Sequence, residues 1–296
     1  MRTAFIDQLI KEATENESIF LLVGDLGYSV VEPFAEKFPD RFLNAGIAEQ
    51  NMTGVAAGLA MEGYNVFTYS IGNFPTLRCM EQIRYDVCYH NLSVKIVAVG
   101  GGYAYGPLGV SHHTTEDIGM LRTIPNLTVC APGDPVETRM VTSFLCNHSG
   151  PGYLRLGKAG EKIIHDGPLQ ETGNHFPKIT EGKETVVLTT GGMLETATAY
   201  VRANNLPWGI YSVPFIKPMN EEALLRIGGA YAKVITLEEH QASAGFGSAI
   251  LEGFNNLVTA GKLTRFPDVK RIAIPDMFVG YAGTQDYIRK QVGLHL

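Results

Sequence analysis

The chain has 296 residues, of which 45% are hydrophobic and 18% charged, and a formal net charge of −6. Its length favours two domains with substantial cores, while its acidic balance gives no electrostatic reason to expect nucleic acid or a membrane surface as partner. No apolar run approaches the roughly 20 residues that span a bilayer, and the four cysteines lack paired or metal-ligand spacing, so we expect a soluble, cytoplasmic protein with reduced thiols.

In the first half of the chain, apolar runs alternate with helical patterns, which is typical of parallel sheets covered by helices. After an amphipathic helix at the N-terminus, the predicted strands are 19–23, 66–69, 94–99 and 127–131. The predicted helices are 48–61, 77–87 and 135–146. Thr114 and Asp117 have the spacing of a capping box that opens a further helix.

Beyond residue 161 the periodicity dissolves into His, Pro, Gly, Lys and Glu, which indicates a linker over residues 166–184. A second alternating unit follows, with strands at 185–189, 209–213, 233–238 and 269–274 and helices at 195–203, 221–227 and 248–260. The sequence therefore predicts an α/β fold of two doubly wound domains with mainly parallel sheets, at residues 1–165 and 185–296.

The segment from Asn44 to Tyr64 places Glu49 early in a helix whose remaining positions are unusually small. Small side chains allow another backbone to approach closely, so we expect this helix to pack against a second helix or a subunit. A carboxylate at such a contact would be partly buried and would need a partner. The simpler interpretation, a first-turn Glu that stabilises the helix dipole, stays open from the residues alone.

Two adjacent histidines, His112 and His113, follow a glycine-rich loop directly before a predicted helix. Loop histidines in such places commonly face a cleft, whereas neighbouring histidines rarely converge on one metal ion. Phe74, just beyond the strand that ends at Tyr69, and Asp25, at the end of strand 19–23, are further candidates. Each also has a structural interpretation, as a core aromatic or as a helix cap.

These segments resemble those of transketolases and 1-deoxyxylulose-5-phosphate synthases, most strongly between residues 44 and 122. The resemblance implies that Glu49 binds the aminopyrimidine of thiamine diphosphate and shifts its amine to the imino form, which removes the thiazolium proton. It implies that Phe74 stacks on the pyrimidine, and that His112 hydrogen-bonds substrate oxygens. Asp25 and Tyr69 are expected near the cofactor.

Three departures from transketolases concern the substrate. Gly100 stands where they carry a His that helps to bind the sugar, Leu108 where they carry an Asp for a substrate hydroxyl, and Lys158 where an Arg binds the acceptor's phosphate. The residues expected to bind substrate are His112, His113, Arg155 and Lys158. These departures predict a site that does not accept the usual pentose and tetrose phosphates. Tyr103 and Tyr105 either line a pocket for a less charged substrate or are exposed loop residues.

The family binds its divalent ion through Gly-Asp-Gly followed downstream by Asn, and this sequence lacks that motif, since Gly24-Asp25-Leu26 departs at its third residue. We therefore expect an N-terminal transketolase subunit to carry the motif and to hold Mg²⁺ and the diphosphate. The expected assembly is a heterotetramer with two copies of each subunit, while the chain alone is expected to dimerise without activity.

The leading hypothesis is thus a subunit of a split transketolase, which moves a two-carbon ketol unit from a ketose to an aldehyde. Three alternatives stay open: the beta subunit of a 2-oxo-acid dehydrogenase, an enzyme similar to deoxyxylulose-phosphate synthase, and a non-catalytic interaction subunit of the same fold.

Overall fold

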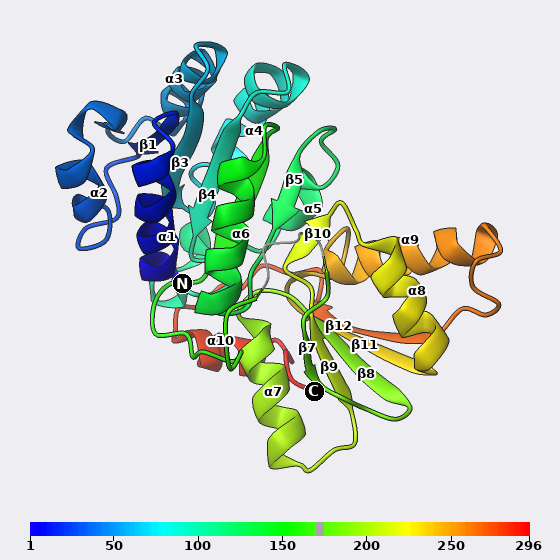
Figure 1. Cartoon of the computed structure of the whole chain (residues 1–296). Helices are drawn as coiled ribbons and strands as arrows, with labels where there is room; N and C mark the ends of the chain where they lie inside the picture. Colours follow the sequence, from blue (N-terminus) through cyan, green and yellow to red (C-terminus); the bar gives the residue numbers. More distant parts are fainter. Residues whose placement is uncertain (170–174) are drawn as a thin grey trace.

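Two separate β-sheets organise the protein, and the computed structural model describes residues 1–169 and 175–296 (Figure 1). The first sheet contains β1 (Ile19–Val23), β2 (Phe42–Asn44), β3 (Asn65–Ile71), β4 (Val94–Val99), β5 (Thr128–Cys130), β6 (Gly152–Leu156) and β10 (Phe215–Lys217). The second contains β7 (Lys178–Thr180), β8 (Thr185–Thr189), β9 (Gly209–Ser212), β11 (Lys233–Gln241) and β12 (Asp268–Ile274).

The strand orders are β10-β5-β6-β4-β3-β1-β2 and β12-β11-β8-β9-β7. Every neighbouring pair is parallel except β10 with β5 and β7 with β9, each of which joins an antiparallel edge strand. The predicted α/β class, with two doubly wound domains and mainly parallel sheets, is confirmed.

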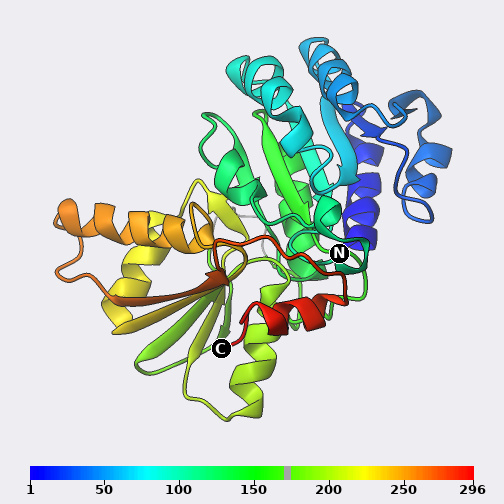
Figure 2. The same ribbon diagram turned by 180° about the vertical axis from the view of Figure 1, so that it is seen from behind.

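Helices cover both faces of each sheet (Figures 1 and 2). On the first sheet, α1 (Arg2–Glu15) and α6 (Pro135–Asn147) pack side by side on one face. The opposite face carries α3 (Glu49–Met61), α5 (Asp117–Leu121), and α4 (Met80–Gln82) with its π-helical continuation η3 (Ile83–Tyr89). The short helix α2 (Glu32–Lys37) lies beyond β1.

On the second sheet, α7 (Met193–Ala203) and α10 (Gln285–Gln291) contribute to one core cluster, and α8 (Glu221–Ala230) and α9 (Phe246–Thr259) to the other. The helices α7, α8 and α9 bury one apolar stripe each, as their spacing predicts. Helix α10 is absent from the prediction and buries only Ile288.

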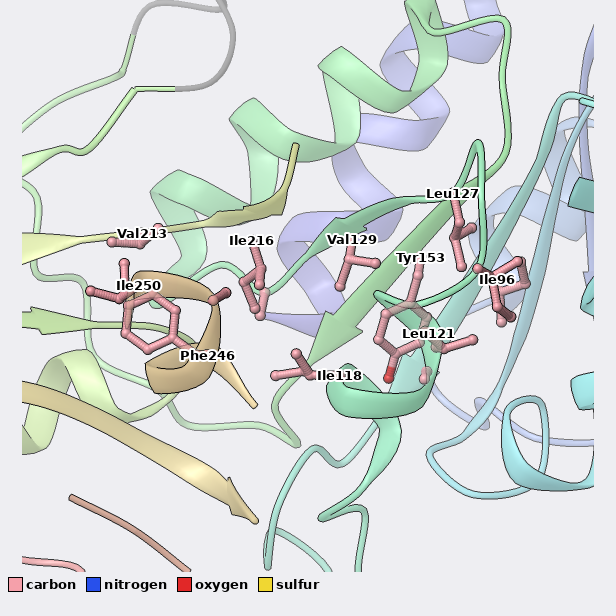
Figure 3. Close-up of a cluster of buried hydrophobic side chains, with 14 of the residues drawn as sticks. Ile96, Ile118, Leu121, Leu127, Val129, Tyr153, Val213, Ile216, Phe246 and Ile250 are labelled. Carbon is pink, nitrogen blue, oxygen red and sulfur yellow. The ribbon is translucent and has the colours of Figure 1, made fainter. Parts of the chain in front are cut away.

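One buried apolar cluster runs through both domains (Figure 3). Ile118 and Val129 of the first domain meet Ile216 and Phe246 from the second half of the chain. Each side chain of this size contributes about 1.5–3 kcal/mol when it leaves water. The two domains therefore share a hydrophobic interior and are not merely tethered by a linker.

Strand β10 strengthens this union, because it leaves its own half and pairs with β5 of the first sheet. The backbone N–H of Ala131 also donates to the carbonyl of Pro214 at 2.8 Å. Within the predicted linker, β7 pairs with β9 and so belongs to the second sheet. A strand of three residues is too short for alternation to show in sequence. Residues 170–174 of that predicted linker lie outside the described residues.

The predicted capping box at Thr114 and Asp117 is wrong. Helix α5 begins at Asp117, its N-cap residue is Glu116, and no side chain caps it. The buried Asp117 carboxylate instead accepts hydrogen bonds from the Tyr153 hydroxyl at 2.6 Å and from Nε of Arg155 at 2.8 Å. A buried guanidinium offers a carboxylate a stronger partner than a backbone N–H does.

All four cysteines are free and buried. Burial raises the pKa of Cys79 to about 11 and that of Cys88 to about 12, which makes these thiols poor nucleophiles at neutral pH. None of the helices in the described parts of the chain has the length and apolarity to cross a membrane.

Candidate active site

Glu49 begins α3, and its side chain is buried with only 2% exposure. The end of β1 lies against it, since an ideal Cβ on Gly24 would stand 3.6 Å from the Glu49 Cγ. Oε2 of Glu49 accepts a hydrogen bond from Nη1 of Arg78 at 2.8 Å. Oε1 forms no hydrogen bond with any residue that the structure describes. The site therefore presents a buried carboxylate with one oxygen available.

Phe74 and His112 meet near Arg78, the partner of this carboxylate. Their rings are edge to face, with centroids 5.3 Å apart and planes at 72°. The guanidinium of Arg78, which holds Glu49, lies 5.1 Å from the Phe74 ring centroid. Glu49, Arg78, Phe74 and His112 thus form one continuous group near the carboxyl ends of β1 and β3, the edge where open α/β sheets bind ligands.

The two histidines have different surroundings. His112 is half-buried, and its Nδ1 lies 3.0 Å from the Ser111 hydroxyl. His113 is 4% exposed, its ring stands edge-on to Tyr103 at 5.0 Å, and burial lowers its pKa. Nε2 of His113 has no hydrogen-bond partner among the described residues. The His113 side chain lines a cavity of about 70 Å³, together with the 277–279 segment of the second domain.

Arg155 joins the two domains. Besides its bond to Asp117, its Nη2 donates to the carbonyls of Thr114 at 2.7 Å and Glu239 at 3.0 Å. Its side chain is 6% exposed. It also borders an interdomain cavity of about 390 Å³ that Lys158 and Arg289 line. The hydrogen bonds of Arg155 are to protein groups, so its predicted contact with substrate stays a prediction.

Lys158 is exposed at the edge of the same cavity. Its Nζ lies 5.2 Å from the ring centroid of Tyr105. It forms no ion pair with a carboxylate of residues 1–169 or 175–296. The cation is therefore available to a ligand.

Asp25 and Tyr69 form no hydrogen bond or ring contact with Glu49, Arg78, Phe74 or His112 in the parts of the chain that the structure describes. Asp25 adopts a left-handed conformation with φ of 54°, and its Oδ1 accepts a hydrogen bond from Nδ2 of Asn44 at 3.0 Å. Tyr69 is 2% exposed and stacks on Phe5 of α1 at 6.0 Å, on the other side of the sheet. Burial raises the pKa of Tyr69 well above its usual value. Their predicted contacts with the cofactor stay predictions.

Arg78 is the residue of this group that sequence reasoning missed. It lies 29 positions beyond Glu49, in the 3-10 turn η2 (Leu77–Cys79). A half-exposed Arg in a helical pattern carries no local signal, so only the fold brings it to the carboxylate.

Two family models match the chain: the transketolase pyrimidine binding domain over residues 1–160 and the transketolase C-terminal domain over residues 175–295. A protein of Methanocaldococcus jannaschii named as the C-terminal section of a transketolase is 34% identical, with 99% of this chain and 92% of that protein covered. A subunit of the apulose-4-phosphate transketolase of Actinobacillus succinogenes is 33% identical, with 89% and 84% covered.

A solved structure titled as a split gene transketolase, inactive beta4 tetramer, superposes with a TM-score of 0.85 at 31% identity. The match covers 99% of this chain and 93% of the chain in that structure. Both domains and the order in which they follow one another therefore match along nearly the whole length. The chain belongs to the transketolase family, as the section that holds its pyrimidine-binding and C-terminal domains.

Proposed function

We propose that this chain is one subunit of a split transketolase, which transfers a two-carbon ketol unit from a ketose donor to an aldehyde acceptor. The observation that carries this proposal is the buried Glu49 carboxylate, with one free oxygen, beside Phe74 and His112. The relatives that this chain spans almost completely are named as a section or as subunits, which supports an enzyme divided between two polypeptides.

The Glu49 group fits the aminopyrimidine of thiamine diphosphate. Oε1 of Glu49 is free to accept a hydrogen bond from a ring nitrogen, and the half-buried Phe74 offers a flat apolar face. The buried hydroxyl of Ser70, next to Gly24, also lacks a partner among the described residues. When bound, thiamine diphosphate supplies the carbon that carries the ketol unit between donor and acceptor.

In this proposal Glu49 holds a proton between its Oε1 and the ring nitrogen. Burial makes that hydrogen bond stronger than it would be in water. Phe74 excludes water from one face of the site. His112, whose Nε2 has no hydrogen bond to the described residues, hydrogen-bonds the substrate oxygen and moves its proton.

We propose that an N-terminal transketolase subunit supplies the diphosphate and Mg²⁺ site, in a heterotetramer with two copies of each chain. Within the described ranges, no three His, Cys, Asp or Glu side chains are grouped so that they could hold a metal ion. Helix α3 offers a surface for close approach, because a Cβ on Gly54 or Gly58 would meet nothing within 4 Å. The solved relative whose title describes an inactive tetramer of beta chains supports inactivity of this chain alone.

For the substrate we propose a sugar that ends in an anionic group, phosphate or sulfonate. The unpaired ammonium of Lys158 supports this class. The names of two relatives also support it. One is a subunit of an apulose-4-phosphate transketolase, and the other, from Clostridium sp. at 32% identity, is a subunit of a 6-deoxy-6-sulfo-D-fructose transketolase. A deoxyxylulose-phosphate synthase of Geobacter sulfurreducens is 33% identical, but this chain spans only 45% of its length.

The test is reconstitution with an N-terminal transketolase subunit that carries the Gly-Asp-Gly motif. Consumption of hydroxypyruvate, pyruvate and a branched 2-oxo acid is measured with an aldehyde acceptor, thiamine diphosphate and Mg²⁺. We expect hydroxypyruvate to be consumed, and only by the pair. Preference for pyruvate would favour the synthase chemistry, preference for the branched acid would favour the dehydrogenase chemistry, and turnover by the single chain would contradict the split enzyme.

A further inference from the structure

The ring of Tyr105 fills the space that a side chain at position 100 would need. An ideal Cβ on Gly100 would lie 2.2 Å from Cδ2 and 2.3 Å from Cε2 of Tyr105, which is far inside van der Waals contact. Gly100 has φ of +89°, and its N–H donates to the Leu156 carbonyl at 2.9 Å. The backbone is thus fixed in a conformation that favours glycine, and the Tyr105 ring excludes any side chain at position 100.

Tyr105 also lies between two groups of the proposed site. Its ring centroid is 6.4 Å from that of His112, with the planes at 69°, and 5.2 Å from Nζ of Lys158. The half-buried ring packs on the apolar cluster beneath α1. Burial raises the pKa of Tyr105, so the ring stays a neutral phenol. A rigid apolar surface therefore connects the residue proposed to move protons with the unpaired cation.

We propose that Tyr105 is a specificity-determining residue for the transfer reaction, and this inference rests on the proposed function. Its ring forms the wall along which the carbon chain of the sugar lies, and it positions the Lys158 ammonium for the anionic end group. Aromatic rings offer apolar contact and hold ammonium groups over their faces. Because no polar side chain fits at position 100, the substrate is recognised here by its shape and end charge, without a hydrogen bond to that position.

The experiment uses the reconstituted pair with hydroxypyruvate as the common donor. The acceptors are glyceraldehyde 3-phosphate, its sulfonate counterpart 3-sulfolactaldehyde, and neutral glyceraldehyde. The readout is the ratio of kcat/KM for each anionic acceptor to that for glyceraldehyde. The variants are Tyr105→Leu, Tyr105→Phe and Lys158→Met, with Tyr64→Leu as the control. Tyr64 is also half-buried, but it packs on Phe20 at 5.6 Å in another part of the core.

We expect Tyr105→Leu to lower the ratio about tenfold, mainly through KM. The Lys158 ammonium would lose its contact with the ring, and the carbon chain of the sugar would lose the aromatic surface against which it packs. Tyr105→Phe keeps the ring and should stay within about twofold of the wild type. Lys158→Met changes an exposed side chain that folding does not need, and as a single variant it should lower the ratio. In a double variant with Tyr105→Leu it should lower the ratio little further, since the effects of coupled residues are not additive. Tyr64→Leu should leave the ratio unchanged.

A wild-type ratio near one for both anionic acceptors would overturn the inference. So would an unchanged ratio in a folded, active Tyr105→Leu pair, or equal losses in Tyr105→Phe and Tyr105→Leu, which would assign the effect to the hydroxyl. If Tyr105→Leu does not fold, the decision passes to Lys158→Met, and an unchanged ratio in that folded variant would contradict the inference. Failure of the wild-type pair to use hydroxypyruvate would instead contradict the proposed function. The better anionic acceptor identifies phosphate or sulfonate as the end group.

Discussion

Nη1 of Arg78 lies 2.8 Å from Oε2 of Glu49, so a guanidinium that is 48% exposed holds a carboxylate that is 2% exposed. The pair connects the first residue of α3 to the turn η2 beyond β3. One oxygen of the carboxylate is fixed by this contact, and the other forms no hydrogen bond with the residues that the structure describes. We infer that Arg78 positions Glu49 before the cofactor binds.

Replacement of Arg78 with Met should weaken the binding of thiamine diphosphate by the reconstituted pair. The buried carboxylate would lose its partner, which costs about 1–2 kcal/mol after allowance for the exposure of Arg78. We therefore expect the cofactor concentration for half-maximal activity to rise about tenfold. Arg84→Met, on an exposed Arg of η3, is the matched control. Equal cofactor titrations for Arg78→Met and wild type would rule out the positioning role.

His112 and His113 can be separated by their kinetics. His112→Asn should lower kcat of the pair about 100-fold or more, because the group proposed to move protons at the substrate is lost. His113→Gln should affect thermal stability more than turnover, since the His113 ring is buried against Tyr103. Steady-state kinetics and melting temperatures of both variants decide the matter. A larger loss of kcat in His113→Gln than in His112→Asn would reverse the assignment.

Replacement of Arg155 should lower the thermal stability of the protein. Arg155→Leu leaves the Asp117 carboxylate buried without its cation, and breaking such a buried pair costs about 3–5 kcal/mol. For a chain of this size we expect the melting temperature to fall by about 10 °C. Arg139→Leu is the control, because its pair with Asp7 is about half exposed, at 46% and 50%, and contributes at most about 1 kcal/mol. Equal shifts for both variants would refute the role of Arg155 in joining the domains.

The sequence predicts much of the site because its signals are local. Glu49, Phe74 and His112 each stand at a strand end or a helix beginning, and the structure brings all three together. Long-range pairing leaves no such signal. The contact of Arg78 with Glu49 and the hydrogen bond of Arg155 to the Glu239 carbonyl, 84 positions away, depend on tertiary structure alone.

The limits are similar for the fold. Apolar runs predict the strands β1, β3, β4 and β8, because their periodicity extends over several residues. The central strand β6, which lies between β4 and β5, is absent from the prediction. Strand β10 has three residues and crosses to the sheet of the other domain, and β7 lies within the predicted linker. In both strands, tertiary packing decides the conformation, since three residues are too few for a periodic pattern.

A buried acidic cluster predicts that stability falls as pH rises above about 5. His165 Nδ1 lies 3.0 Å from Asp134, and its Nε2 lies 3.4 Å from Oε1 of Glu137. Burial raises the pKa of Glu137 from 4.5 to about 7. Burial opposes the charge on His165, but its hydrogen bond to Asp134 and the charge of Glu137 outweigh it, and its pKa is raised.

Both shifts act in the same direction. Stability from the protonated Glu137 is complete below pH 4.5 and is lost as pH rises through about 7, and that from His165 is lost above 6.5. We expect the free energy of unfolding, measured with urea, to fall by about 2 kcal/mol between pH 5 and pH 8. Glu137→Gln should flatten this slope, and exposed Glu62→Gln should not. A wild-type slope in Glu137→Gln would show that the cluster does not cause the pH dependence.

The central claim is that the Glu49 carboxylate drives the chemistry, and Glu49→Gln in the reconstituted pair tests it most directly. The replacement keeps the size of the side chain and removes its ability to take a proton. The rate of ketol transfer from hydroxypyruvate is measured at saturating thiamine diphosphate, with exposed Glu62→Gln, at the end of the same helix, as control. We predict a loss of at least about 100-fold while the two subunits still co-purify; a rate within about twofold of the wild type would contradict the account.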